Sequence, residues 1–138
     1  MTRRSRVFKL RLSPAGMDLL ISSHCHLIQS TRALLAWGTT LHVAVEHLDR
    51  APASDLFELF EPKACAPFLG NEEHHLGALK GVNEIAARIA ARVCDRSSHA
   101  ASPMISIVYI VALQHLRTAD PETLKAAWMA VRGQRENI

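Results

Sequence analysis

The sequence predicts a mainly α-helical fold: a small bundle of about four to five helices with a short N-terminal strand or extended segment. Alanine and leucine, which favour helices, dominate the apolar residues, and apolar residues recur every three or four positions through most of the chain. With 138 residues, 49% of them hydrophobic, the chain is long enough for one domain, residues 1–138, and short for two.

Residues 1–12 are predicted to form a basic arm or strand. From Val7 to Leu12 the residues alternate, and a period of two indicates a half-buried strand whose inner face carries Phe8, Leu10 and Leu12. Ser13 and Pro14 fit the N-cap and the first position of a helix. They therefore open a helical stretch, residues 13–50.

That stretch is long for a single helix, so a turn is expected inside it. Either Ser22-Ser23 or Gln29-Ser30-Thr31 is expected to hold the turn, with Ser30 as a second N-cap. A further weak point is the stretch Gly38-Thr39-Thr40, because these residues disfavour a helix interior.

The middle of the chain is predicted to be irregular before helix resumes. Prolines and Gly70 interrupt residues 51–70, which leaves room there for one short helix. Residues 71–96 are predicted to be a helix, because Asn71 suits a cap and Glu72 and Glu73 follow in the first turn, where acids complement the helix dipole.

Two elements complete the chain. Residues 103–118 are predicted to be a buried element: the β-branched run Met104–Leu113 suits a strand, whereas its continuation into Gln114–Arg117 suits a helix, which its helical neighbours favour. The last helix, residues 120–133, opens with Asp120-Pro121-Glu122 and is expected to end at Gly133.

Positive charge is concentrated at the N-terminus. The net charge is only +3, yet five basic residues precede the first acidic one, Asp18: Arg3, Arg4, Arg6, Lys9 and Arg11. A basic start before a balanced remainder has two interpretations. It is either an arm that binds phosphates or the acidic surface of a partner, or a terminus whose charges are simply solvated.

The cysteines and the apolar runs indicate the cellular compartment. The three cysteines are widely spaced and form no CxxC pair, which fits a reducing cytoplasm. No secretory signal is visible, and the longest apolar run, Met104–Leu113, is too short to span a bilayer. The sequence therefore predicts a cytoplasmic protein without a membrane partner.

No pattern of catalytic or metal-binding residues is recognisable. His24-Cys25-His26 and Glu72-Glu73-His74-His75 are the densest groups among the eight histidines, but their spacing matches no zinc finger and the other helices lack matching carboxylates. Neither a nucleophile elbow nor a phosphate-binding glycine motif occurs. We expect no catalytic residue, metal or cofactor, and hence no enzyme.

One segment, residues 7–37, suggests a mechanism. The order and spacing of its elements resemble those of the ribbon-helix-helix family of dimeric DNA-binding proteins. The elements are the strand Phe8–Leu12, the helix start Ser13-Pro14, Leu19-Leu20 in the first helix, Ser30 at the second N-cap and Leu34-Leu35 in the second helix. The resemblance implies that the strand pairs with its twin in a second copy and that Lys9 and Arg11 enter the major groove. It also implies backbone contacts from Arg3, Arg4 and Arg6.

The resemblance covers about a quarter of the chain and departs from the family in one respect. The family usually has a glycine in the turn before the second helix, where this chain has His26-Leu27-Ile28-Gln29. A second similarity concerns the five residues Val82-Asn83-Glu84-Ile85-Ala86. They are similar to part of an asparagine-containing helix that follows such a module in the sequence of plasmid mobilisation accessory proteins.

Two functional hypotheses follow. The first is a dimeric DNA-binding accessory or regulatory protein that reads double-stranded DNA with its N-terminal strand. The second is a non-enzymatic helical adaptor or inhibitor that binds another protein through an apolar helix face. A homodimer is expected in either case, because apolar helices in so small a chain often complete the burial of their apolar surface by dimerising.

Overall fold

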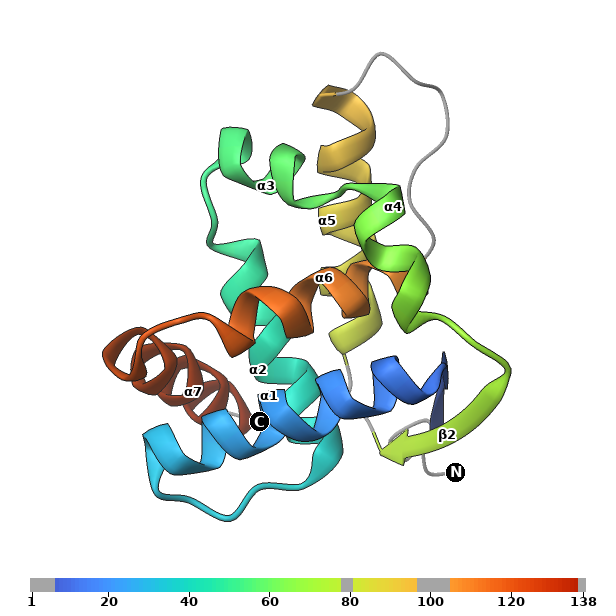
Figure 1. Ribbon diagram of the computed structural model, residues 1–138. Helices are drawn as coiled ribbons and strands as arrows, with labels where there is room; N and C mark the ends of the chain where they lie inside the picture. The colour runs from blue at the N-terminus through green and yellow to red at the C-terminus, as the bar shows by residue number, and fades with distance from the viewer. Residues whose placement is uncertain (1–6, 78–80, 97–104, 137–138) are drawn as a thin grey trace, which may run out of the picture.

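The computed structural model describes residues 7–77, 81–96 and 105–136, and most of these residues lie in helices (Figure 1). Five substantial helices are α1 (Pro14–Thr31), α2 (Trp37–Asp49), α5 (Val82–Arg96), α6 (Ile105–Arg117) and α7 (Pro121–Glu136). Two shorter helices, α3 (Ala53–Leu59) and α4 (Pro62–Cys65), and the 3₁₀ turn η1 (Ala66–Phe68) lie between α2 and α5. The strands β1 (Val7–Leu12) and β2 (Glu72–Gly77) form a two-stranded sheet. The predicted mainly α class is confirmed.

Helix α2 lies at the centre of the core. Every residue from Gly38 to Leu48 is buried, so the helix has no solvent face. It packs against α6, α5, α7, β2 and α1. Residues 105–113 of the β-branched run that suited either a strand or a helix lie in the helix α6, in which residues 108–113 are buried. Its β-branched residues are tolerated because packing outweighs their weak helix propensity.

The start of α1 is as the sequence predicts. Pro14 occupies the first turn, and the Ser13 hydroxyl accepts a hydrogen bond of 3.1 Å from the Gly16 backbone N–H. The same hydroxyl donates to the Pro67 carbonyl oxygen, and the Ser13 N–H donates to the Phe68 carbonyl oxygen at 3.1 Å. Ser13 therefore caps the helix and also joins it to η1.

The turn after α1 differs from the expectation. Ser30 lies inside α1 and is no second N-cap, and Leu34-Leu35 lie in the connection 32–36 ahead of α2. The helix ends because Arg32 adopts the left-handed conformation (φ 56°), from which its N–H donates to the Ile28 carbonyl oxygen at 2.8 Å. This C-cap needs no glycine before the second helix.

Two further predicted boundaries were wrong. The predicted helix 71–96 is divided: residues 72–77 are β2, and among the described residues of this range the helix, α5, covers 82–96. Pairing with β1 satisfies backbone groups on both strands, which outweighs the helix signal of Glu72 and Glu73. Gly133 does not end the last helix, because α7 continues to Glu136.

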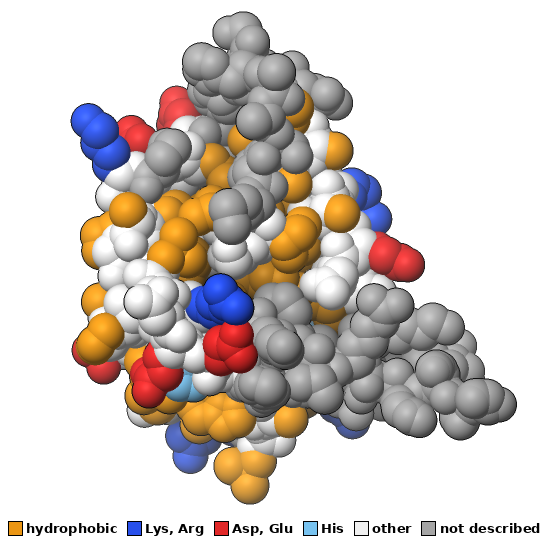
Figure 2. Space-filling model, turned by 90° about the vertical axis from the view of Figure 1, so that its right-hand side faces the viewer, with side chains coloured by type: hydrophobic (Ala, Val, Ile, Leu, Met, Phe, Trp, Pro, Cys, Tyr) orange, Lys and Arg blue, Asp and Glu red, His pale blue; other side chains and the backbone are white. Residues whose placement is uncertain are grey.

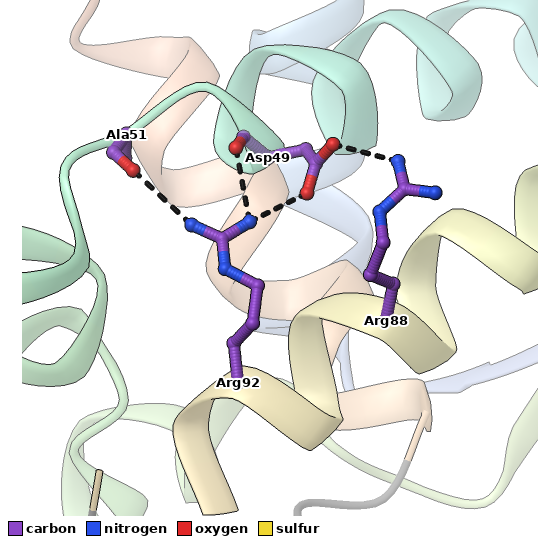
Figure 3. A network of polar contacts seen from close by, with 4 residues as sticks. All are labelled: Asp49, Ala51, Arg88 and Arg92. Atoms are coloured by element: carbon purple, nitrogen blue, oxygen red, sulfur yellow. Dashed lines mark hydrogen bonds and ion pairs between the residues drawn. The ribbon is translucent and has the colours of Figure 1, made fainter. Parts of the chain in front are cut away.

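Helices α2 and α5 are joined by an ion-pair network at the C-terminal end of α2 (Figure 3). The Asp49 carboxylate accepts from Arg88 at 2.7 Å and from Arg92 at 2.6 Å. Arg92 also donates to the carbonyl oxygens of Asp49 (3.1 Å) and Ala51 (3.4 Å). Arg92 thus binds backbone carbonyls where α2 ends, while Arg88 contacts only the carboxylate in the part of the network drawn.

This difference predicts unequal losses of stability. Arg92→Ala is expected to lower the free energy of unfolding by about 2 kcal/mol, because it leaves carbonyl and carboxylate oxygens without their charged donor. Arg88→Ala is expected to cost less than about 1 kcal/mol, as for other exposed ion pairs. Urea unfolding followed by circular dichroism measures both variants, and equal losses would contradict the capping role of Arg92.

Candidate nucleic-acid interface

The candidate interface is the ribbon formed by β1 and β2. The strands are antiparallel, with Cα partners running from Val7 and Gly77 at one end to Leu12 and Glu72 at the other. Leu10 and Leu12 are fully buried, which confirms that one face of β1 lies on the core. In the described structure β1 thus pairs with a strand of its own chain, whereas the resemblance implies a strand from a second copy.

The opposite face of the ribbon carries Arg11. Its side chain is 67% exposed, and its Nε and Nη2 groups donate to one carboxylate oxygen of Glu73, at 3.1 and 2.8 Å. Glu73 is the Cα partner of Arg11 across the ribbon, and its side chain is 34% exposed. The outward face therefore combines a guanidinium and a carboxylate.

The other predicted contact residues are placed only in part. Lys9 lies two positions before Arg11 in β1 and pairs through its backbone with His75, but its side chain is outside the described structure. Arg3, Arg4 and Arg6 lie entirely outside the described residues.

Glu73 was missed as a member of this face, because the sequence predicted it to begin a helix. The signal that could have found it is the spacing of two glycines: Gly70 lies just ahead of the strand β2 and Gly77 is its last residue, as turn residues typically bound a strand. Gly70 also lies against the β1–α1 junction, where a Cβ would come within 2.6 Å of Leu12 and Ser13 backbone atoms.

The ribbon has a fixed position relative to α1. Leu12 forms an isolated bridge with Leu69, directly after η1, and Ser13 is bonded to η1 through both its N–H and its hydroxyl. On the side of the molecule where β2 and α4 lie, Figure 2 shows hydrophobic side chains near the centre and charged side chains of both signs around them.

Two of the described histidines, His24 and His26, make structural contacts. His24 bonds to the Thr40 hydroxyl at 2.7 Å and stacks on Trp37, and His26 bonds to the Ala119 carbonyl oxygen at 2.7 Å. Within the ranges 7–77, 81–96 and 105–136, no three His, Cys, Asp or Glu side chains lie close enough together to hold a metal ion. Cys65 is buried, and this burial raises the pKa of its thiol.

Asn83, the asparagine of the second similarity, also has a structural contact. Its side-chain oxygen accepts a hydrogen bond of 2.7 Å from the Tyr109 hydroxyl, which joins α5 to α6. Burial raises the pKa of Tyr109, so this hydroxyl remains a donor at neutral pH.

A second exposed feature is apolar. We call it the α1–α2 corner and define it by Ile21, Ile28, Leu34 and Trp37. Leu34 is 97% exposed, Ile21 41% and Trp37 40%. Ile28 and Leu34 line a shallow hollow of about 250 Å³ together with Gln29, Arg32 and Ala33. Ile28 is half-buried, and exposed apolar side chains such as the other three are typical of a surface that another protein covers.

Comparisons with protein-family models, with curated proteins and with solved structures find no match for this chain. None of the described helices combines the length and the apolarity needed to cross a bilayer.

Proposed function

We propose that this protein binds double-stranded DNA, as a dimeric accessory or regulatory protein, with the outward face of the β1–β2 ribbon. The observation that carries the proposal is the position of Arg11, exposed on a two-stranded antiparallel ribbon that is joined to the N-terminal end of α1. A two-stranded ribbon fits the major groove of B-form DNA.

The chemistry of the residues supports the same interpretation. An arginine can donate two hydrogen bonds to the edge of guanine or to a phosphate. Lys9, two positions along the same strand, adds a second cation, and Arg3, Arg4 and Arg6 precede the ribbon and would contact the phosphate backbone. In this proposal the strand reads the groove and the helices carry the ribbon.

The double substitution Lys9→Ala with Arg11→Ala is expected to abolish DNA binding while the fold survives, because the Arg11 side chain is 67% exposed and its ion pair with Glu73 lies on the outward face. The measurement is fluorescence anisotropy of labelled random duplex DNA at two salt concentrations, where wild-type affinity should fall steeply with salt. Circular dichroism confirms folding.

A matched control removes the same two charges elsewhere. Arg117 and Lys125 are exposed at the end of α6 and in α7, so Arg117→Ala with Lys125→Ala should retain most of the affinity. If both double variants lost the same DNA affinity, the loss would be explained by net charge alone and not by the position of Lys9 and Arg11. The absence of binding by micromolar wild-type protein at low salt would refute the proposal.

The second candidate function is an adaptor or inhibitor that binds a protein, and the exposure of Leu34 favours it. An adaptor would tolerate the Lys9 and Arg11 substitutions and would lose its partner when the α1–α2 corner is made polar. The same corner is a candidate contact for the proposed homodimer, because a two-fold axis through it would bring the same apolar residues of the two copies together.

Leu34→Ser is expected to shift the chain from dimer to monomer, because Leu34 is the most exposed large hydrophobic residue described. Size-exclusion chromatography with light scattering measures the molar mass. Met129→Ser, at an apolar residue of α7 that is 56% exposed, is the control and should leave the mass unchanged. A dimer that persists in Leu34→Ser would place the interface elsewhere.

A further inference from the structure

The pairing of Arg11 with Glu73 bears directly on how the ribbon would bind DNA. One oxygen of the Glu73 carboxylate accepts two hydrogen bonds from the guanidinium of Arg11, at 2.8 and 3.1 Å. The two residues are Cα partners in the antiparallel ladder, so the backbone itself brings the charges together. The contact is therefore a consequence of the register of the ribbon.

The carboxylate occupies donors that DNA would use. Carboxylates and phosphates both accept hydrogen bonds from the planar fork of a guanidinium, and guanine offers a similar pair of acceptors in the major groove. The Nε–H of Arg11 and the Nη2–H beside it can bind a base or a phosphate only after they leave Glu73, so the pair occupies two of the five guanidinium donors. The Glu73 carboxylate would then lie beside the negatively charged backbone of the duplex.

We propose that Glu73 is an internal competitor that lowers the affinity of the ribbon for DNA by occupying Arg11. This inference rests on the proposed DNA binding and adds a residue that regulates it. Glu73 acts through Arg11, and its effect is limited because both side chains are partly exposed, 34% and 67%. Exposed pairs of this kind correspond to changes of about fivefold or less in an equilibrium constant.

Glu72 provides a matched control. It carries the same charge one residue earlier in β2, is 69% exposed and lies opposite Leu12 in the register. Its carboxylate is 3.4 Å from His74, and the contacts found for Arg11 involve Glu73. Replacing either glutamate by glutamine changes the net charge equally, but only Glu73→Gln removes the negative charge that pairs with Arg11.

The experiment is a double-mutant cycle on duplex binding by the full chain, measured by anisotropy at low salt. Glu73→Gln is expected to tighten binding about fivefold, and Glu72→Gln less than about twofold. In an Arg11→Ala background, Glu73→Gln should give no more than the gain of Glu72→Gln. Raised salt should reduce the specific gain, because it screens exposed charges.

The outcomes separate the two proposals. If wild-type protein binds DNA and the two glutamine variants gain equally, the competitor role of Glu73 is wrong and DNA binding stands. The competitor role is also wrong if Glu73→Gln gains as much affinity without Arg11 as with it. If neither the wild type nor Glu73→Gln binds, DNA binding itself is wrong, and the role of Glu73 with it.

Discussion

Gly16→Ala is expected to lower the free energy of unfolding by about 3 kcal/mol, although alanine is normally the better helix former. Gly16 lies in the first turn of α1, where the helix touches η1. A Cβ built there would overlap the carbonyl oxygen of Phe68 and lie 3.0 Å from the Cβ of Leu12. The Phe68 carbonyl is backbone that already accepts the Ser13 N–H, so it cannot move aside without breaking that bond.

Gly133→Ala is the control for this substitution. Nothing lies within 4 Å of a Cβ built at Gly133, which sits inside α7, so alanine should raise the free energy of unfolding by up to about 1 kcal/mol. Urea unfolding followed by circular dichroism measures both variants. If Gly16→Ala were as stable as Gly133→Ala, the close approach of α1 and η1 would be wrong.

Acidification is expected to destabilise the protein through His47. This side chain is buried at the C-terminal end of α2 and stacks on His115 of α6, with ring centroids 4.5 Å apart. Burial lowers the pKa of His47 to about 4, with further lowering from His115 and Arg50 and an opposing effect of Asp120. Burial also lowers the pKa of His115, against the effect of Asp55.

The direction of the pH dependence follows from these pKa values. Between pH 6.5 and about 4 the unfolded chain binds a proton at His47 that the folded chain does not, so stability falls as the pH falls through this window. A lowering of the pKa from 6.5 to about 4 corresponds to about 3 kcal/mol, complete below pH 4.

The measurement is the free energy of unfolding in urea at a series of pH values for wild type and His47→Phe. Phenylalanine keeps a flat ring against His115 and removes the titrating group, so the variant should lose most of the dependence between pH 6.5 and 4. A wild-type stability that is level over this interval, or an undiminished slope in the variant, would show that His47 is not the group responsible.

Local chemistry predicted the elements that long-range packing does not alter. Ser13 starts a helix because its hydroxyl accepts a hydrogen bond from a backbone N–H of the first turn. Pro14 suits the first helical position because it has no backbone N–H to leave unpaired there. Both effects are independent of where the helix then packs. Leu10 and Leu12 were expected in the core because alternation in a strand decides which face is apolar.

Elements that depend on a distant partner were not predictable in the same way. Glu72 and Glu73 carry a good helix-start signal, yet their segment is a strand because β1 lies beside it, more than sixty residues away in sequence. The pairing that completes the outward face, Arg11 with Glu73, depends on that ladder. The DNA-binding role of this face remains a prediction.

Because α2 is enclosed from Gly38 to Leu48, the chain's tolerance to substitution is expected to be unevenly distributed. A helix on the surface can vary freely along its outer stripe, but an enclosed helix has no such stripe. Even the polar positions of α2, Thr40, His42 and Glu46 among them, are buried, so any change there alters the packing of several neighbours at once. Related sequences should therefore diverge along the outer face of α7 long before they diverge along α2.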